Sequence, residues 1–282
     1  MSNLLLSLSC QDRVGLLSEV TGFCASKGLN LLEAHQFTDL ENSWFFTRLE
    51  VAPTETFVGF DNLYAEATKL GQKLRAFWHL RKKSDIKRVA IMVSKNGHCL
   101  ADLLWRWSSG ELPMKLVGVI SNHLDHQNIV EREKLPFVHI PIFDKATSFA
   151  AVKTQLEAWK VDTIVLARYM QVLPPEICAR WNNKIINIHH SFLPAFVGAQ
   201  PYHQAHLRGV KLIGATCHYV NNDLDAGPIL DQEVARVTHA HTVHDMIKLG
   251  QDCERLALFR GLQSHLEDRV FVHNGRTIIF KD

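Results

Sequence analysis

The chain has 282 residues, of which 46% are apolar and 21% charged, and its formal net charge is +2. This length accommodates two domains with buried cores, and the near-neutral charge argues against a nucleic-acid footprint or a polybasic membrane anchor. No apolar run is long enough to predict a transmembrane helix. The six cysteines are scattered without a C-x-x-C pair, and the N-terminus has no basic segment, so we expect free thiols in the cytoplasm.

The first part of the chain, residues 1–84, alternates strand and helix patterns in the order β-α-β-β-α-β. This is the ferredoxin-like split βαβ plan. Strands are predicted by apolar, β-branched runs between turn residues, and helices by apolar residues at three- and four-residue spacing. The predicted strands cover residues 4–9, 31–38, 44–51 and 75–80, and the predicted helices cover residues 14–27 and 60–74.

The run D-R-V-G-L, between the first predicted strand and helix, contains Asp12, Arg13 and Gly15. With the βαββαβ plan, this run resembles the ACT domain, a small regulatory module that often binds amino acids at subunit interfaces. A glycine lets the backbone come close to a ligand, and the N–H groups at a helix start suit a carboxylate. The resemblance implies a homo-oligomer with an amino-acid effector at these three residues. A domain that serves only as a dimerisation surface fits the pattern as well.

From residue 85 to residue 282, short apolar strands alternate with helices, which predicts an α/β domain with a Rossmann-like, mostly parallel sheet covered on both faces. Ligands of such sheets bind beyond the carboxyl ends of the strands. A hairpin is predicted at residues 270–280, around Asn274-Gly275. The other predicted strands cover residues 88–94, 114–121, 137–142, 163–167, 184–188 and 211–220, and the helices cover residues 99–109, 127–134, 148–160 and 175–180.

Three polar side chains at predicted strand ends suggest chemistry. Asn187 and His189 alternate along a strand, so they share one face, while Asp225 lies in a turn that ends at Gly227. An amide and an imidazole can hold a developing oxyanion, and a carboxylate beside them can move a proton. His218 is expected to face the same site, with its neighbour Cys217 on the opposite face of the strand. Each side chain taken singly also fits a structural role.

Metal and nucleotide sites have little support in the sequence. Eight of the sixteen histidines lie between residues 189 and 244, but none forms H-E-x-x-H or pairs with a cysteine at ligand spacing. The loop at residues 94–99 has neither G-x-G-x-x-G nor a P-loop pattern. We therefore expect neither a metal nor a cofactor.

The motifs N-I-H at residues 187–189, L-P-x-F-x-G-A at 193–199 and D-L-D-A-G-P-I at 223–229 resemble the signature of formyltransferases that use 10-formyltetrahydrofolate. Residues 166–173 resemble the folate-binding loop of that family, and the resemblance covers residues 85–282. It implies that Asn187, His189 and Asp225 are catalytic and that His218 supports them. The implied substrate-binding residues are Arg168, Tyr169, Met170, Leu173 and Gly227.

Two departures from the transferase pattern point to one branch of the family. His190 stands where transferases have proline, and the phosphate-binding loop reads S-K-N-G-H-C, with Lys95 and Cys99 in place of a glycine and an asparagine. With the ACT-like segment, these residues resemble the formyltetrahydrofolate deformylases, which hydrolyse the formyl donor to formate and tetrahydrofolate and feed one-carbon and purine metabolism. The alternatives are a formyltransferase to a small amine such as glycinamide ribonucleotide, and an amino-acid sensor with a decayed catalytic domain.

The mechanism implied by this resemblance is direct attack by water on the formyl carbon. Asn187 and His189 would hold the oxyanion, and Asp225 would pair with His189 and relay the proton of the water to N10, the leaving nitrogen. His218 would orient Asp225 or His189. Members of this branch are associated with methionine and glycine as opposing effectors.

Overall fold

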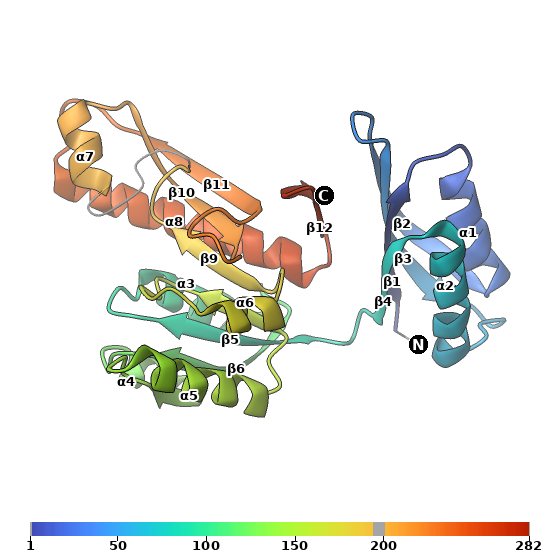
Figure 1. Ribbon diagram of the computed structural model, residues 1–282, viewed down its shortest axis with the longest axis horizontal. Coiled ribbons are helices and arrows are strands. Elements are labelled where there is room, and N and C mark those ends of the chain that lie inside the picture. Colours follow the sequence, from blue (N-terminus) through green and yellow to red (C-terminus); the bar gives the residue numbers. More distant parts are fainter. Residues whose placement is uncertain (1, 194–200, 282) are drawn as a thin grey trace. The chain divides into compact units, whose positions relative to one another are not determined.

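The computed structural model describes residues 2–193 and 201–281, and the chain divides after Ile86 into two compact units (Figure 1). In the described part of the chain, no helix is both long and apolar enough to cross a bilayer. Of the motif predicted at residues 193–199, only Leu193 is described, and residues 194–199 lie outside the described residues.

The first unit has the predicted βαββαβ order. Its antiparallel sheet has the strand order β2-β3-β1-β4. Helices α1 and α2 contribute Val20, Leu63 and Ala67 to a core shared with Leu6 and Leu49 on the sheet, so one face of the sheet is the core face. The elements are β1 (Leu4–Gln11), α1 (Leu16–Ser26), β2 (Leu29–Asp39), β3 (Trp44–Pro53), α2 (Phe60–Leu74) and β4 (Phe77–Lys82).

Two boundaries in this unit differ from the prediction for local backbone reasons. Helix α1 starts at Leu16 because Gly15 has a left-handed conformation, with φ of 87°, and Val14 before it is 98% exposed. Strand β4 starts at Phe77 because Arg75, with φ of 49°, ends α2 in a left-handed cap.

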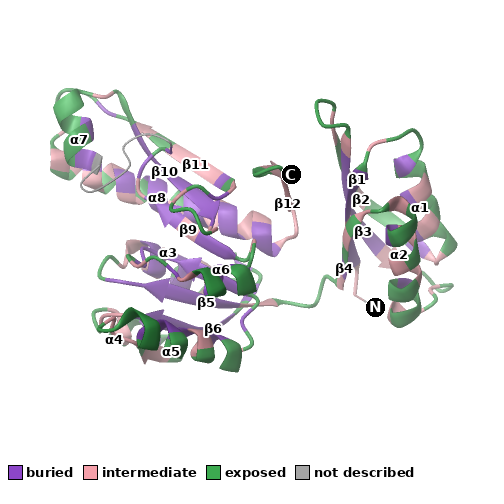
Figure 2. Cartoon of the chain, in the orientation of Figure 1, coloured by how far each residue is buried: buried purple, intermediate pink, exposed green. Residues whose placement is uncertain are grey.

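The second unit is built on a seven-stranded sheet with the order β11-β10-β9-β8-β5-β6-β7. Strands β5 to β9 are parallel to one another, and β10 is antiparallel to both β9 and β11. The central strands are buried on both faces (Figure 2). The elements up to β10 are β5 (Lys87–Val93), α3 (His98–Ser108), β6 (Met114–Ser121), α4 (Gln127–Arg132), β7 (Phe137–His139), α5 (Lys145–Ala158), β8 (Thr163–Leu166), α6 (Pro175–Arg180), β9 (Ile185–His189), α7 (Pro201–Arg208) and β10 (Leu212–Tyr219).

The sequence analysis missed β11 (Ile229–Arg236) and α8 (Val243–Leu266). Helix α8 begins with a capping box, in which Thr242 and Asp245 exchange hydrogen bonds with each other's backbone. It packs closely on β10, because a Cβ at Gly261 would lie 2.5 Å from the Cys217 sulfur. This packing covers the sheet face opposite His218.

Smaller differences have local causes. Strand β7 ends at His139, before Pro141, and α5 starts at Lys145 because the Asp144 side chain accepts a hydrogen bond from the Thr147 amide. The predicted hairpin is present as β12 (Val270–His273) and β13 (Arg276–Ile279). Its turn has positive φ at both Asn274 and Gly275, as a two-residue turn of this kind requires.

Candidate active site

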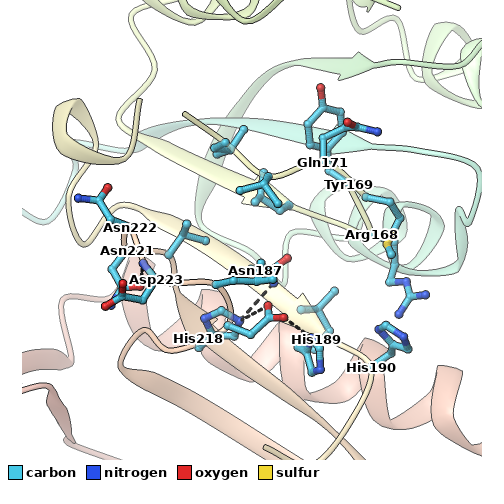
Figure 3. A pocket seen from close by; sticks show the side chains of 18 residues that line it. Arg168, Tyr169, Gln171, Asn187, His189, His190, His218, Asn221, Asn222 and Asp223 are labelled. Carbon is cyan, nitrogen blue, oxygen red and sulfur yellow. Dashed lines mark hydrogen bonds and ion pairs between the residues drawn. The ribbon is translucent and has the colours of Figure 1, made fainter. Parts of the chain in front are cut away.

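A cavity of about 320 Å³ opens at the carboxyl ends of β8 and β9, where the sheet class predicts a ligand site. Figure 3 shows Arg168 and His190 at one end of the cavity, residues 221–223 at the other, and Asn187 between them. Its walls are apolar with a few convergent polar groups, the usual character of a small-molecule site. It is lined by Leu166, Arg168, Tyr169, Met170, Gln171, Val172, Leu173, Asn187, Ile188, His189, His190, His218, Val220, Asn221, Asn222, Asp223, Leu224 and Asp225.

Asn187 and His218 are paired across β9 and β10, so their side chains share a sheet face. The Asn187 amide nitrogen lies 3.2 Å from Nε2 of His218, and Nδ1 of His218 lies 2.9 Å from the Tyr219 carbonyl oxygen. A carbonyl only accepts, so a neutral ring that satisfies both contacts donates from Nδ1 and accepts at Nε2. His218 therefore orients the Asn187 amide and leaves its second N–H for a ligand.

His189 and Asp225 form the second pair of the site. The Asp225 Oδ2 atom lies 3.2 Å from Nδ1 of His189, and its Oδ1 atom lies 3.6 Å from Nε2 of His218. The hydrogen bond from His189, with His218 close by, outweighs burial and holds the pKa of the Asp225 carboxyl well below its usual range. Nε2 of His189 is buried and has no hydrogen-bond partner among the described residues, so it is available to a substrate.

The turn that carries Asp225 differs in detail from the prediction. Asp225 itself has a left-handed backbone, with φ of 54°, whereas the φ of Gly227 is not positive. A Cβ at Gly227 would lie 1.7 Å from the Tyr219 carbonyl oxygen, so this glycine is needed for close approach of the two backbone segments. Gly227 is also not among the residues that line the cavity.

The other predicted substrate residues, Arg168, Tyr169, Met170 and Leu173, all line the cavity. Ser94 ties this loop to the end of β5: its hydroxyl accepts from the Met170 amide at 3.0 Å and donates to Oδ1 of Asn122 at 2.7 Å. Burial raises the pKa of the Tyr169 phenol to about 12. The Tyr169 hydroxyl is buried and has no hydrogen-bond partner in the described part of the chain.

Helix α8 contributes Glu254, which the sequence analysis missed. Its carboxylate lies 2.8 Å from Nε2 of His98, 3.1 Å from the Tyr202 hydroxyl and 3.3 Å from Nη1 of Arg168. The Glu254 side chain is only 2% exposed, and burial alone would raise its pKa, but the His98 hydrogen bond and the Arg168 charge outweigh burial and lower it. Burial, with the nearby Arg168 charge, lowers the pKa of His190 to about 4.

His98, Cys99 and Glu254 are also the one group of possible metal ligands found among the described residues, with ligand atoms within 4.8 Å of one another. Two features make these three residues a poor cation site. The Arg168 guanidinium contacts the same Glu254 oxygen as His98, and burial raises the pKa of the Cys99 thiol well above its ordinary value. A neutral thiol and a neighbouring cation both oppose metal binding.

The predicted effector residues lie between β1 and α1 of the first unit. The Asp12 amide donates to the Ser43 carbonyl, and the Arg13 guanidinium lies 2.5 Å from the Glu19 carboxylate, so Arg13 is already paired. A Cβ placed at Gly15 would meet no atom within 4 Å, which leaves open space beside this turn.

Comparison with known proteins gives the family. The formyl transferase family model matches residues 87–262, and the ACT domain model matches residues 5–55. The formyltetrahydrofolate deformylase of Bacillus subtilis is 45% identical over 98% of this chain and 93% of its own length. That of Corynebacterium sp. is 42% identical over 98% and 97%.

Solved structures agree with this assignment. The crystal structure of a formyltetrahydrofolate deformylase from Pseudomonas syringae has a TM-score of 0.96 and 46% identity over 100% of this chain and 95% of its own. Glycinamide ribonucleotide transformylase 1 from Symbiobacterium toebii, with a TM-score of 0.67 and 27% identity, matches 72% of this chain and 98% of its own. The chain therefore belongs to the formyltetrahydrofolate deformylases.

Proposed function

We propose that the cavity hydrolyses 10-formyltetrahydrofolate to formate and tetrahydrofolate, with Asn187, His189 and Asp225 as its catalytic residues. Hydrolysis forms a bond from the water oxygen to the formyl carbon and breaks the bond from that carbon to N10, which gains a proton. The reaction needs one site for an oxyanion and one path for a proton, and it draws on no cofactor. The pterin end of the substrate lies against the loop at residues 168–173.

The oxyanion is held by Asn187 and His189. The second N–H of the Asn187 amide, left over from the contact with His218, donates to the formyl oxygen. Protonated His189, paired with Asp225 through Nδ1, donates from Nε2. Each such donor contributes roughly 2.7–4 kcal/mol in other enzymes, because it is aimed at charge that develops in the transition state.

Asp225 takes the proton from the attacking water and passes it to N10. Its pKa is low, but a water that has added to a carbonyl carbon carries a positive oxygen, which is far more acidic than free water. A weakly basic carboxylate can therefore accept this proton, and the carboxylic acid formed then releases the proton readily to the leaving nitrogen. The observation that supports this function most is the His189–Asp225 pair with an unengaged Nε2 beside the Asn187 amide.

The direct test is incubation of the full-length protein with 10-formyltetrahydrofolate and no amine. Formate and tetrahydrofolate should appear in equal amounts, at a rate that added glycine amide does not raise. A rate that depends on an amine would favour formyl transfer. Transfer is the weaker candidate, because the deformylases match nearly the whole chain whereas the transformylase from Symbiobacterium toebii matches 72% of it.

For the first unit we propose an amino-acid effector site around Asp12 and Gly15, in a homo-oligomeric, cytoplasmic enzyme. The open space at Gly15 and its left-handed backbone support close approach of a ligand or a second chain. Methionine and glycine should change the hydrolysis rate in opposite directions, and light scattering should give more than one chain per particle. A monomer whose rate responds to neither amino acid would contradict this part of the proposal.

A further inference from the structure

The backbone of Tyr219, the last residue of β10, contacts two of the polar elements of the cavity. Its carbonyl oxygen lies 2.9 Å from Nδ1 of His218 and so fixes the orientation of that ring. Its amide donates to the Pro228 carbonyl at 2.9 Å, and a Cβ at Gly227 would lie 1.7 Å from its carbonyl oxygen. These contacts tie the turn that carries Asp225 to the same residue. A shift of the Tyr219 backbone would therefore move His218 and Asp225 together.

The Tyr219 side chain lies on the opposite face of the sheet, in the core that α8 covers. Its hydroxyl lies 2.8 Å from Nδ1 of His265, in the last turn of α8, and the two rings meet edge to face with their centroids 5.7 Å apart. Nε2 of His265 lies 2.8 Å from the hydroxyl of Thr163, the first residue of β8. All three side chains are buried.

This buried chain of contacts holds Tyr219 in one arrangement. A neutral imidazole donates from one ring nitrogen and accepts at the other, so the two hydroxyls satisfy both nitrogens of His265. A buried polar group that loses its partner is costly, which opposes any movement of the hydroxyl away from the ring. Because the tyrosine side chain is rigid, a hydroxyl held at its far end also restricts the backbone.

The end of α8 that carries His265 is fixed in turn. The Lys87 ammonium, at the start of β5, donates to the His265 carbonyl oxygen at 2.6 Å and forms an ion pair with Asp268. A cation at this end satisfies a carbonyl that has no partner within the helix. His265 is therefore a firm support for the Tyr219 hydroxyl.

We propose that Tyr219 and His265 are positioning residues of the hydrolytic reaction: from the far face of the sheet, their hydrogen bond holds the end of β10, so that His218 and Asp225 keep their places in the cavity. The inference rests on the hydrolytic function proposed above. Neither Tyr219 nor His265 is among the residues that line the cavity. Their loss should therefore lower kcat and leave KM nearly unchanged, since the exact placement of the reacting groups matters most in the transition state.

The first test compares two substitutions that each remove one hydroxyl from the same ring. Tyr219→Phe and Thr163→Val keep the side-chain shape, and each leaves one nitrogen of His265 without its partner. In urea unfolding of the full-length protein, both variants should lose a similar amount of stability. Formate release from 10-formyltetrahydrofolate should separate them. Tyr219→Phe should lower kcat about tenfold and keep KM within about twofold of the wild-type value, whereas Thr163→Val should keep the wild-type kcat.

The second test substitutes His265 itself and keeps one contact at a time. His265→Asn places an amide where Nδ1 lies, which retains a partner for the Tyr219 hydroxyl, whereas His265→Gln places its amide near Nε2 and retains the Thr163 contact. His265→Asn should keep kcat within about threefold of the wild-type value, and His265→Gln should lose about tenfold, as Tyr219→Phe does.

Equal losses of kcat in Tyr219→Phe and Thr163→Val would overturn the proposal, because the effect would then follow the stability of the core. A folded Tyr219→Phe variant with the wild-type kcat would overturn it as well. If Tyr219→Phe does not fold, the two His265 substitutions decide: equal kcat values, or the greater loss in His265→Asn, would overturn the proposal. Failure of the hydrolytic function itself is distinguishable, because the wild type would then release no formate without an amine.

Discussion

Replacing Asp225 by asparagine should remove catalysis and leave the fold intact. Asp225 has φ of 54°, a region that asparagine tolerates better than most residues, so the turn keeps its backbone. The substitution removes the charge that faces Nδ1 of His189 at 3.2 Å. At an effective dielectric of about 20, a unit charge pair at this distance is worth about 5 kcal/mol. The carboxylate is partly exposed and the amide retains a dipole, so we expect a loss of about 4 kcal/mol, or about 10³-fold in kcat.

The assay is formate release under saturating substrate, with thermal unfolding measured in parallel. Asp225→Ala is the comparison, because alanine at this φ adds strain of roughly 1 kcal/mol or more. It should lose both activity and several degrees of melting temperature. The reasoning is refuted if Asp225→Asn keeps more than a tenth of the wild-type kcat while its melting temperature is unchanged.

Four further outcomes follow from the geometry. His218→Ala should lower kcat by about 10–100-fold with little change in KM, since it releases the Asn187 amide from its orienting contact; equal changes in both constants would contradict this role. Ser94→Ala removes one hydrogen bond to the Met170 amide of the loop at residues 168–173 and one to Asn122, so it should chiefly raise KM, by about tenfold, which steady-state kinetics would show. Gly227→Ala should destabilise the protein by more than 2 kcal/mol in urea unfolding, because its Cβ would collide with a backbone carbonyl. The pKa of His190 in the folded protein is about 4, below the value of 6.5 in the unfolded chain, so the unfolded chain takes up the proton first as the pH falls. The free energy of unfolding should therefore decrease by up to about 3 kcal/mol between pH 6.5 and 4. His190→Asn should flatten this pH dependence, which urea unfolding at several pH values would show.

Much of the fold, and which side chains face the cavity together, follow from local patterns. The alternation of side chains along a strand correctly places Asn187 and His189 on one face, and puts Cys217 behind His218 against α8. Short apolar runs between turn residues identify the strands β1 to β10, and burial on both faces makes this pattern most distinct for central strands such as β5 and β8.

What the sequence analysis missed depends on contacts between distant residues. Helix α8 lacks a clear apolar stripe, since its buried face includes Gly250, Gly261 and Glu254. Its capping box at Thr242 was the local signal that could have revealed it. Glu254 contacts His98, which lies 156 positions earlier in the chain, and no spacing rule predicts such a pair. The close approach of Gly227 to the Tyr219 carbonyl is likewise visible only in three dimensions.

The central claim is that water attacks the formyl carbon directly, with no amine and no covalent intermediate. A single turnover of the full-length protein with 10-formyltetrahydrofolate in ¹⁸O-labelled water tests it most directly. We predict one formate per tetrahydrofolate, with one solvent oxygen in each formate from the first turnover. Formate that appears only when an amine is added, or first-turnover formate without the label, would contradict the account.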